Sequence, residues 1–435
     1  MEIINKIEDV FGVCRDLPKT YVERVLVDKV LIASLSRKKH IVIHGGSKQG
    51  KTCLRKSALQ ESDYIVIQCQ GNRGLRELYS MILKEAGAEI TVSESKTISG
   101  ASKVWVKFKA KLSIPFVSEV EAETAAEATR SNSTTIEIEN IEIDISEAND
   151  VIRILKNMNF DKFIVLEDFH YLDIDVQKSI AIDLKVFHEK SDISFIVVGV
   201  WMEQNRLALY NGDLTNRVIP INADIWTGDE LIAVIRAGES LLNIKIREDA
   251  VRAIISASHS NIGLVQEICW NLCENSEIYE TQNELKEIGT IEQVDNIVKN
   301  ISHTQSGRYR NFISDFSEGF QQTPNELHKW IMAIIICHPV ANLKVGMLQS
   351  ELFRLICRTH KNANKLKLSH VVQALRTTSR LQQKKHVQPV ILDYNANESR
   401  LKVVDSGFLL FLEREDTADL LDVMKMVLKS KEKDS

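Results

Sequence analysis

A glycine-rich octapeptide near the start of the chain has the residue types and the spacing needed to hold phosphate groups. Glycines let a backbone curl so that successive N–H groups point at phosphate oxygens. We expect Lys51 to reach the β- and γ-phosphates of a nucleotide and the Thr52 hydroxyl to ligate Mg²⁺. The alternative is a glycine-rich turn that has no role in ligand binding. The pattern G-x-x-x-x-G-K-[ST] is matched by Gly45, Gly46, Ser47, Lys48, Gln49, Gly50, Lys51 and Thr52.

Two adjacent carboxylates could complete a site for phosphoryl transfer. Glu167 and Asp168 follow the apolar run 163–166, which predicts a buried strand with an acidic tip that faces the phosphates. One carboxylate would hold the magnesium shell and the other would polarise the attacking water. By position we assign the metal to Glu167 and the base to Asp168, which swaps the commoner order of Asp and Glu. The reverse assignment stays open, as does a strand that merely ends at a solvated turn. His170 is either a γ-phosphate sensor or a structural histidine.

The elements around both motifs alternate strand and helix, which is typical of a parallel α/β sheet. The apolar strand 41–43 precedes the glycine loop, and a helix opens after it near Cys53. We also expect the first 30 residues to be helical, with Val22, Val25, Leu26 and Val30 on one stripe. Further strands are expected at 64–67, 163–166, 194–200 and 218–221, and further helices at 75–86 and 177–190.

The alternation breaks between about residues 88 and 150. Period-two apolar patterns over 103–116 and 135–145 predict a β-rich insertion, with an Ala- and Glu-rich segment at 119–129 between them. After the sheet the pattern is helical, with helices expected near 229–242, 249–256, 262–274 and 291–300, and a polar linker at 303–310.

At 435 residues the chain should divide into two or three domains. We expect a P-loop α/β core at 1–225, which includes the insertion, a helical lid at 226–302 and a C-terminal domain at 311–435. In that last segment three helices precede a β-hairpin formed by 389–392 and 400–404, which is the order of a winged helix.

The C-terminal segment also carries a local excess of positive charge. Between residues 361 and 386 there is no Asp or Glu, and a basic face there fits contacts to DNA phosphates. The alternative is a solvated helix face in a winged helix that binds protein. The basic residues in this stretch are Lys361, Lys365, Lys367, Arg376, Arg380, Lys384 and Lys385.

The segment 21–24 with Asp28, followed by the strand and the loop 47–52, resembles the start of AAA+ ATPases of the origin-initiator and transposition-regulator kind. The STAND ATPases of bacterial defence and signalling are similar. The resemblance covers most of the chain apart from the insertion. It implies ATP and Mg²⁺ as cofactors, an AAA+-like α/β core with a helical lid and a C-terminal winged helix, and assembly into a homo-oligomer.

The same resemblance implies further site residues. Arg217 stands where such proteins often place an arginine finger, which reaches the γ-phosphate in a neighbouring subunit. An arginine on a solvated loop is the alternative. Asn205 is our candidate for the sensor that follows the third strand. The lid segment 261–266 contains no arginine, so we expect no second sensor.

Composition limits the remaining possibilities. A formal charge of −5 argues against a uniformly basic nucleic-acid binder, and 44% hydrophobic with 26% charged residues fits a soluble globular protein. No run of 18 apolar residues and no secretion signal are present, so we expect a cytoplasmic protein that does not enter the membrane. The 7 cysteines are scattered and odd in number, which argues against a disulfide framework.

Two functions fit these features. One is an ATP-driven oligomeric switch that acts on DNA through the winged helix. The other is a STAND-like regulatory ATPase of a bacterial antiviral defence system, which controls an effector protein encoded nearby without sequence-specific DNA binding.

Overall fold

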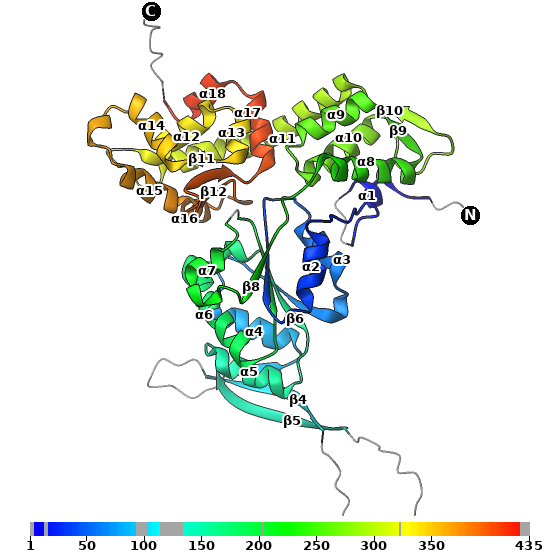
Figure 1. Cartoon of the computed structure of the whole chain (residues 1–435), viewed down its shortest axis with the longest axis vertical. Helices are drawn as coiled ribbons and strands as arrows, with labels where there is room; N and C mark the ends of the chain where they lie inside the picture. The colour runs from blue at the N-terminus through cyan, green and yellow to red at the C-terminus, as the bar shows by residue number, and fades with distance from the viewer. Residues whose placement is uncertain are drawn as a thin grey trace, which may run out of the picture.

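The computed structural model describes residues 4–12, 16–92, 103–113, 134–201, 203–321 and 323–426. These residues form an α/β core with an antiparallel arm at its lower end and two lobes above it (Figure 1). One upper lobe is helical, and the other is formed by the C-terminal part of the chain. Within the described ranges, no helix combines the length and the apolar character that a bilayer crossing requires.

The core is a five-stranded parallel sheet with the order β2-β6-β7-β1-β8. Its carboxyl edge gathers the end of β1, which leads into the glycine loop, and the end of β6, which carries the acidic pair. Buried strands with both faces covered explain the continuous apolar runs in the sequence. The predicted α/β class with a parallel sheet is confirmed. The strands are β1 (His40–His44), β2 (Tyr64–Gln68), β6 (Phe163–Glu167), β7 (Phe195–Gly199) and β8 (Val218–Asn222).

Helices cover both faces of this sheet. On one face, α2 (Asp28–Leu35) and α3 (Lys51–Ala58) pack on a cluster that includes Ile41, Ile43 and Val165. On the other face, the alternate strand residues pack with α4 (Leu75–Glu85), α5 (Ala148–Asn157) and α6 (Ile174–Lys190). Because strand side chains alternate between faces, each strand contributes side chains to the hydrophobic layers on both faces of the sheet. Helix α5 was not predicted.

The prediction of a helical stripe over the first 30 residues is wrong. Helix α1 covers only Ile7–Val10, and α2 begins at Asp28. Val25, Leu26 and Val30 are 58%, 62% and 43% exposed. The stripe that faces the core is formed by residues 27, 31 and 34, one position out of phase. Apolar residues occupy both stripes, so local periodicity cannot choose between them, whereas packing on the sheet does.

The insertion forms a separate antiparallel sheet with the order β3-β4-β5. Its strands are Glu89–Val92, Lys103–Ser113 and Thr134–Asp144. The buried alternate residues Val104, Val106 and Phe108 pack with the core. The predicted β-rich insertion is therefore confirmed, although the segment 119–129 lies outside the described residues.

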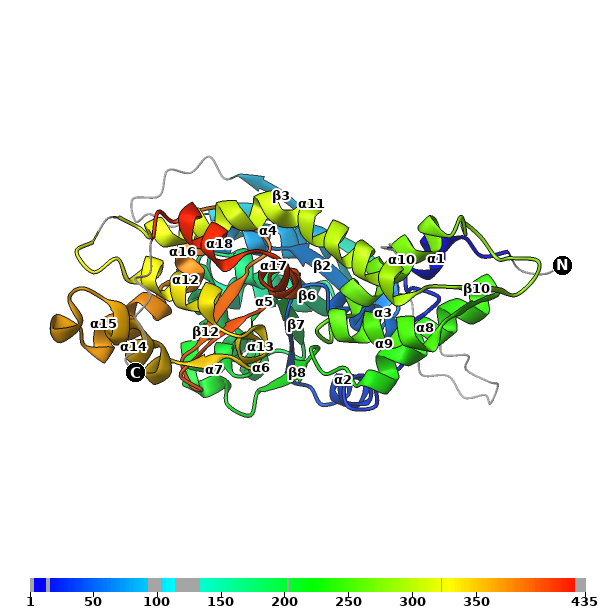
Figure 2. The same cartoon turned by 90° about the horizontal axis from the view of Figure 1, so that it is seen from above.

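The two upper lobes are joined by one long helix, α11 (Ile291–Glu318), which Figure 2 shows from above. The helical lobe contains α8 (Gly228–Leu242), α9 (Glu248–Ala257), α10 (Ile262–Asn275), β9 (Ile244–Ile246) and β10 (Lys286–Ile288). The C-terminal lobe contains the helices α12 (Leu327–Cys337), α13 (Val340–Val345), α14 (Gln349–Thr359), α15 (Leu368–Arg376), α16 (Thr378–Lys384), α17 (Ser406–Arg414) and α18 (Thr417–Val423). Its small sheet has the order β11-β13-β12, with β11 (Met347–Leu348), β12 (Leu392–Asn395) and β13 (Arg400–Val403).

The predicted linker at 303–310 is wrong, because this stretch lies inside α11. Val298 packs in the core of the helical lobe, and Tyr309 and Phe312 pack in the core of the C-terminal lobe. Within 303–310 only Tyr309 is buried. The stretch is polar because most of it faces solvent, and it is helical all the same.

Candidate nucleotide-binding site

The glycine loop joins β1 to α3 at the carboxyl edge of the sheet. Gly50 takes a left-handed conformation with φ of +74°, and a Cβ there would meet only Ile262, at 3.9 Å. The N–H groups of residues 48–52 donate to no backbone carbonyl among the residues that the structure describes. Free N–H groups at the start of a helix form an anion-binding site. The loop therefore fits a chain of phosphate groups.

Lys51 folds back over the loop. Its Nζ donates to Gly46 O at 2.5 Å and to Gly45 O at 3.2 Å. Burial lowers the pKa of Lys51, against the opposing effects of the carboxylates of Asp224, Asp168 and Glu167. The ammonium thus lies between loop carbonyls and acidic side chains. Phosphate oxygens in the loop would give it stronger partners.

Thr52 and Glu167 form the oxygen pair predicted for a metal. The Thr52 hydroxyl donates to Glu167 Oε1 at 2.8 Å, and so connects the first turn of α3 to the tip of β6. Glu167 Oε2 is buried and accepts no hydrogen bond from any described residue. Hydroxyl and carboxylate oxygens are the ligands that Mg²⁺ prefers. These donors fit Mg²⁺, with the remaining ligands coming from water and from the phosphates of a nucleotide.

Asp168, the predicted base, is held by its backbone and by a neighbour. Its φ of +56° is left-handed, which costs roughly 1 kcal/mol for a residue with a Cβ. Gln68, the last residue of β2, donates to Asp168 Oδ2 at 2.5 Å. Burial raises the pKa of Asp168, and the Gln68 hydrogen bond and the charge of Lys51 oppose this rise. Strained, partly buried carboxyls of this kind are found at functional sites.

His170 is fixed by the neighbouring strand, since its Nδ1 accepts from the N–H of Val200 at 3.2 Å. Burial lowers the pKa of His170 to about 3, and the charges of Lys51 and Arg206 add to this effect. The ring is therefore neutral near pH 7. Its Nε2 has no partner in the described part of the chain. It could offer an N–H to a phosphate, but not a positive charge.

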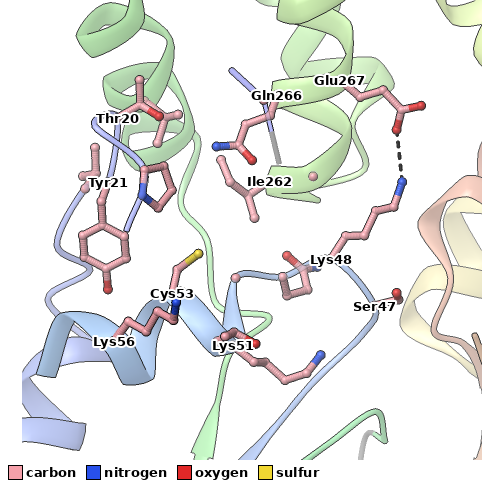
Figure 3. Close-up of a pocket in the computed structure, with 18 of the residues that line it drawn as sticks. Thr20, Tyr21, Ser47, Lys48, Lys51, Cys53, Lys56, Ile262, Gln266 and Glu267 are labelled. Carbon is pink, nitrogen blue, oxygen red and sulfur yellow. Dashed lines mark hydrogen bonds and ion pairs between the residues drawn. The ribbon is translucent and has the colours of Figure 1, made fainter. Parts of the chain in front are cut away.

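The loop lies at one end of a cavity of about 930 Å³ (Figure 3). The phosphate end is lined by the loop, Glu167 and Asp168. A largely apolar pocket with a few polar groups at one end is the usual shape of a small-molecule site, and a nucleotide has matching halves. The rest of the lining includes aromatic and apolar side chains, among them Phe11, Pro18, Tyr21, Trp226, Ile262 and Trp270.

The helical lobe binds the loop through hydrogen bonds and an ion pair. Asn261 caps α10 and also donates its amide to Ser47 O at 2.9 Å, while the N–H of Gly263 donates to Lys48 O at 3.1 Å. Lys48 Nζ pairs with Glu267 at 3.2 Å, which Figure 3 shows as a dashed line. Gln49 Nε2 donates to Ser260 O at 3.4 Å, so the middle of the loop is tied to α10 and the turn before it.

Gln68 and Asp224 belong to the site but were missed from the sequence. The Gly46 N–H donates to Asp224 Oδ1 at 2.6 Å, and burial raises the pKa of Asp224. Gln68 ends β2 and Asp224 lies two residues after β8. Ligands of parallel sheets bind outside the carboxyl ends of the strands. A search for polar residues at each predicted strand end would have found both.

The structure does not bring Arg217 to the cavity of its own chain. Arg217 precedes β8 at the amino edge of the sheet, where its carbonyl accepts from the His40 N–H at 3.1 Å. Its Nη2 pairs with Glu189 on α6 at 2.8 Å. Asn205 is exposed just before α7 (Arg206–Tyr210), whereas the adjacent Arg206 is mostly buried.

No protein-family model matches the chain, and no curated protein matches it. Among solved structures, the chain is similar to the ORC1 protein of Aeropyrum pernix in complex with DNA, with a TM-score of 0.44, 11% identity, and coverage of 97% of this chain and 100% of that one. It is similar to Cdc6p of Pyrobaculum aerophilum, with a TM-score of 0.41, 12% identity, and coverage of 97% and 99%. Both TM-scores are too low to support an argument.

A Walker-type ATPase of Pyrococcus abyssi gives a TM-score of 0.54 at 12% identity, and the match covers 93% of this chain and 99% of that chain. An identity this low is evidence of fold and not of activity. The α/β core, the helical lobe and the C-terminal lobe are thus arranged here in the fold of a Walker-type ATPase.

Proposed function

We propose that this chain binds ATP with Mg²⁺ and hydrolyses it. The observation that carries the proposal is the contact of 2.8 Å between Thr52 Oγ1 and Glu167 Oε1. It joins two motifs 115 residues apart into one oxygen site beside a loop with free N–H groups. A glycine loop or an acidic strand end can each occur by chance in a sequence. That the two lie together at a cavity of nucleotide size is independent evidence, because neither motif by itself requires it.

Each residue then has a role that its position supports. The loop N–H groups bind the phosphates, and Lys51 stabilises the charge that builds up between the β- and γ-phosphates. Glu167 holds the Thr52 hydroxyl in place for the metal, and Asp168 takes a proton from the attacking water. Bound Mg²⁺ would neutralise phosphate charge.

The test is Lys51→Ala. We expect its ATP hydrolysis to fall by about a hundredfold or more, because a positioned charge on a transferring phosphoryl group is worth that much. Turnover is measured by phosphate release, and binding with a fluorescent ATP analogue. Lys38→Ala is the control, since Lys38 pairs with Asp192 at the amino edge of the same sheet. Hydrolysis in Lys51→Ala at the wild-type rate would refute the proposal.

We further propose a division into an ATPase core at 1–225, a lid at 226–302 and a C-terminal domain from 311, an arrangement that would suit a switch function. The C-terminal lobe contacts the site directly, because the Ser47 N–H donates to Val404 O at 3.3 Å. Gln383 also donates to His170 O at 2.8 Å. Arg206 pairs with Asp393 at 3.5 Å, and these side chains are only 14% and 4% exposed. A change of the loop on nucleotide binding would therefore reach the C-terminal lobe through packed contacts.

The proposed target of the switch is DNA. Helices α12, α14 and α15, followed by the β12–β13 hairpin, support a winged helix. Arg376 and Arg380 are exposed on α15 and α16. Lys385 instead pairs with Glu318 at 2.7 Å, and Lys384 lies over the Phe320 ring at 5.4 Å. The basic residues predicted to face DNA thus divide into an outward pair and a pair turned toward the end of α11.

A groove on α15 favours the second candidate, a STAND-like ATPase that controls a separate effector protein. Its volume is about 430 Å³, and it is lined by Leu368, Ser369, Val372, Gln373 and Arg376. Leu368 and Val372 offer an apolar contact beside the Arg376 charge. Exposed apolar side chains next to an arginine are characteristic of protein interfaces.

Assembly of several copies is the last part of the proposal. One exposed apolar surface is formed on and beside α2 by Val25, Leu26, Val30 and Ile32. A second one, over α6 and α7 on the other face of the sheet, is formed by Ile174, Ile182 and Leu209. Arg217 lies beside the second surface through its pair with Glu189. Two different apolar surfaces on one subunit suit a head-to-tail interface, in which Arg217 would serve the neighbouring site.

A further inference from the structure

Arg55 is a buried charge beside the metal-binding carboxylate, and neither sequence motif includes it. It lies on α3 one turn after Thr52, so the helix fixes both residues relative to each other. Its Nε is 3.6 Å from Glu167 Oε2, and the two side chains are 4% and 12% exposed. The guanidinium also stacks on the ring of Tyr64 at 4.4 Å.

This pair is incomplete as a hydrogen bond. A separation of 3.6 Å is a charge contact and too long for a hydrogen bond. Within the described residues, Arg55 Nε and Nη1 and Glu167 Oε2 are buried atoms without a hydrogen-bond partner. Buried charged groups that lack partners are costly, so their presence in a folded protein needs an explanation.

Packing on Tyr64 does not supply that explanation, because an uncharged side chain of similar length would fill the same space. The geometry of the Glu167 carboxylate explains why a charged residue is buried here. Its Oε1 is fixed by the Thr52 hydroxyl at 2.8 Å, but a glutamate has enough rotatable bonds to swing its other oxygen about that point. The positive charge of the guanidinium, 3.6 Å from the far oxygen in a buried site, restricts this freedom.

We infer that Arg55 is a positioning residue of the magnesium site, which holds Oε2 of Glu167 so that Oε1 stays on Thr52. This inference rests on the proposed function. It also accounts for a glutamate at this position, because the longer side chain needs a second anchor. Residues that orient a metal-binding side chain from behind typically change metal affinity by about 10–100-fold.

The experiment compares the binding of the fluorescent nucleotide mant-ATP in EDTA and in MgCl₂. The quantity of interest is the gain in affinity caused by Mg²⁺. We expect Arg55→Met to lower this gain by about tenfold. The affinity in EDTA should stay within about twofold of wild type, since the only ion pair of the Arg55 side chain in the described residues is with Glu167 and not with the phosphate loop. Arg55→Lys, which keeps the charge, should recover part of the gain.

A double-mutant cycle separates positioning from a purely structural role. In the Glu167→Gln background, Arg55→Met should cause no further loss of the Mg²⁺ gain, because the partner carboxylate is already absent. Arg310→Met is the control: it removes an arginine that pairs with Glu415 far from the loop, and it should leave the gain at the wild-type level.

Four outcomes would overturn the inference. One is a lowered melting temperature in Arg55→Met with an unchanged Mg²⁺ gain, which would make Arg55 a packing residue only. Another is additivity in the cycle. If wild-type protein binds mant-ATP but its affinity does not rise with Mg²⁺, the metal assignment of the proposed function is wrong. The inference about Arg55 is then wrong as well. A normal gain in wild type and in Arg55→Met alike refutes the role of Arg55 alone.

Discussion

At the level of single residues, Asp168 is the group whose chemistry depends most on its surroundings. Burial raises the pKa of its carboxyl, and the hydrogen bond from Gln68 at 2.5 Å opposes that rise. A general base acts only when it is ionised. As the pH falls through the raised pKa, Asp168 gains a proton and hydrolysis should stop. The acid limb of the pH–rate profile should therefore lie at a higher pH than it would for an aspartate with the ordinary pKa of about 4.

Gln68→Ala tests this assignment. The substitution removes a hydrogen bond that favours the charged carboxyl, so the pKa of Asp168 should rise further and the acid limb of kcat/KM should move to higher pH. Gln70→Ala, two residues along the chain and exposed, is the control. An acid limb that stays in place in Gln68→Ala, yet moves in Glu167→Gln, would show that we have the two carboxylate roles reversed.

The residues of the site were predictable to different degrees. Residues 45–52 and the acidic pair follow local patterns, so the sequence alone was enough to find them. Gln68 and Asp224 belong to no motif and are marked only by their places after predicted strands, and Arg55 carries no signal at all. They join the site only because the parallel strands bring their carboxyl ends to one edge and because α3 turns Arg55 back toward β6. Their roles depend on neighbours that are remote in sequence.

At the level of elements, α15 and α16 divide the basic residues of the C-terminal lobe. Arg376 and Arg380 face outward, whereas Lys384 and Lys385 contact Phe320, Asp315 and Glu318 at the end of α11 and just beyond it. Lys385 is paired with the carboxylates of Asp315 and Glu318 and so attracts a phosphate less strongly, whereas Lys384 rests on the Phe320 ring. The DNA proposal is therefore narrowed to Arg376 and Arg380 as the residues of this group that contact phosphates.

The expected result is that Arg376→Ala with Arg380→Ala weakens duplex binding and lowers its salt dependence by about two units of slope, one per lost phosphate contact. Binding is measured by fluorescence anisotropy over a range of salt concentrations. Lys384→Ala with Lys385→Ala serves as the matched pair, and its slope should change by less than about one unit. If intact protein binds no duplex at low salt, the groove on α15 becomes the site of a protein partner.

Element boundaries failed where two interpretations of one pattern were equally good. Apolar residues from Val25 to Ile32 allow two helical stripes, and only the sheet selects the one with Val27 and Leu31. Polar residues at 303–310 fit both a linker and a solvated helix face. The second strand of the C-terminal hairpin was predicted well, but the first was placed at 389–392, whereas β12 covers Leu392–Asn395.

At the level of the whole molecule, Arg217 lies at the sheet edge opposite its own loop and pairs there with Glu189, so the catalytic role that we propose for it requires a second copy. We expect Arg217→Ala to bind ATP normally and to hydrolyse it about a thousandfold more slowly, as is typical for loss of an arginine finger. Mixing Arg217→Ala with Lys51→Ala should restore some activity, because mixed assemblies contain interfaces with both residues intact. Turnover is measured across mixing ratios.

The apolar surface around α2 supplies the control for this mixing experiment. Leu26→Glu places a charge in that surface, and Leu26 is 62% exposed, so the subunit itself should still fold. With Leu26→Glu added to both partners, mixing should restore nothing. A protein that stays monomeric with ATP, and whose specific activity does not depend on its concentration, would rule out a role for Arg217 in a neighbouring site.

The unbroken course of α11 has a mechanical consequence. A helix of 28 residues is about 42 Å long and resists bending, so it acts as a lever between the lobe that grips the phosphate loop and the lobe that carries the basic face. If the helical lobe tilted by about 10°, the far end of such a rod would move by about 7 Å. This movement requires that the C-terminal lobe separate from the core, where Ser47 contacts Val404, His170 contacts Gln383 and Arg206 pairs with Asp393. A small local adjustment around a nucleotide would thus be amplified into a displacement comparable to the width of a DNA groove.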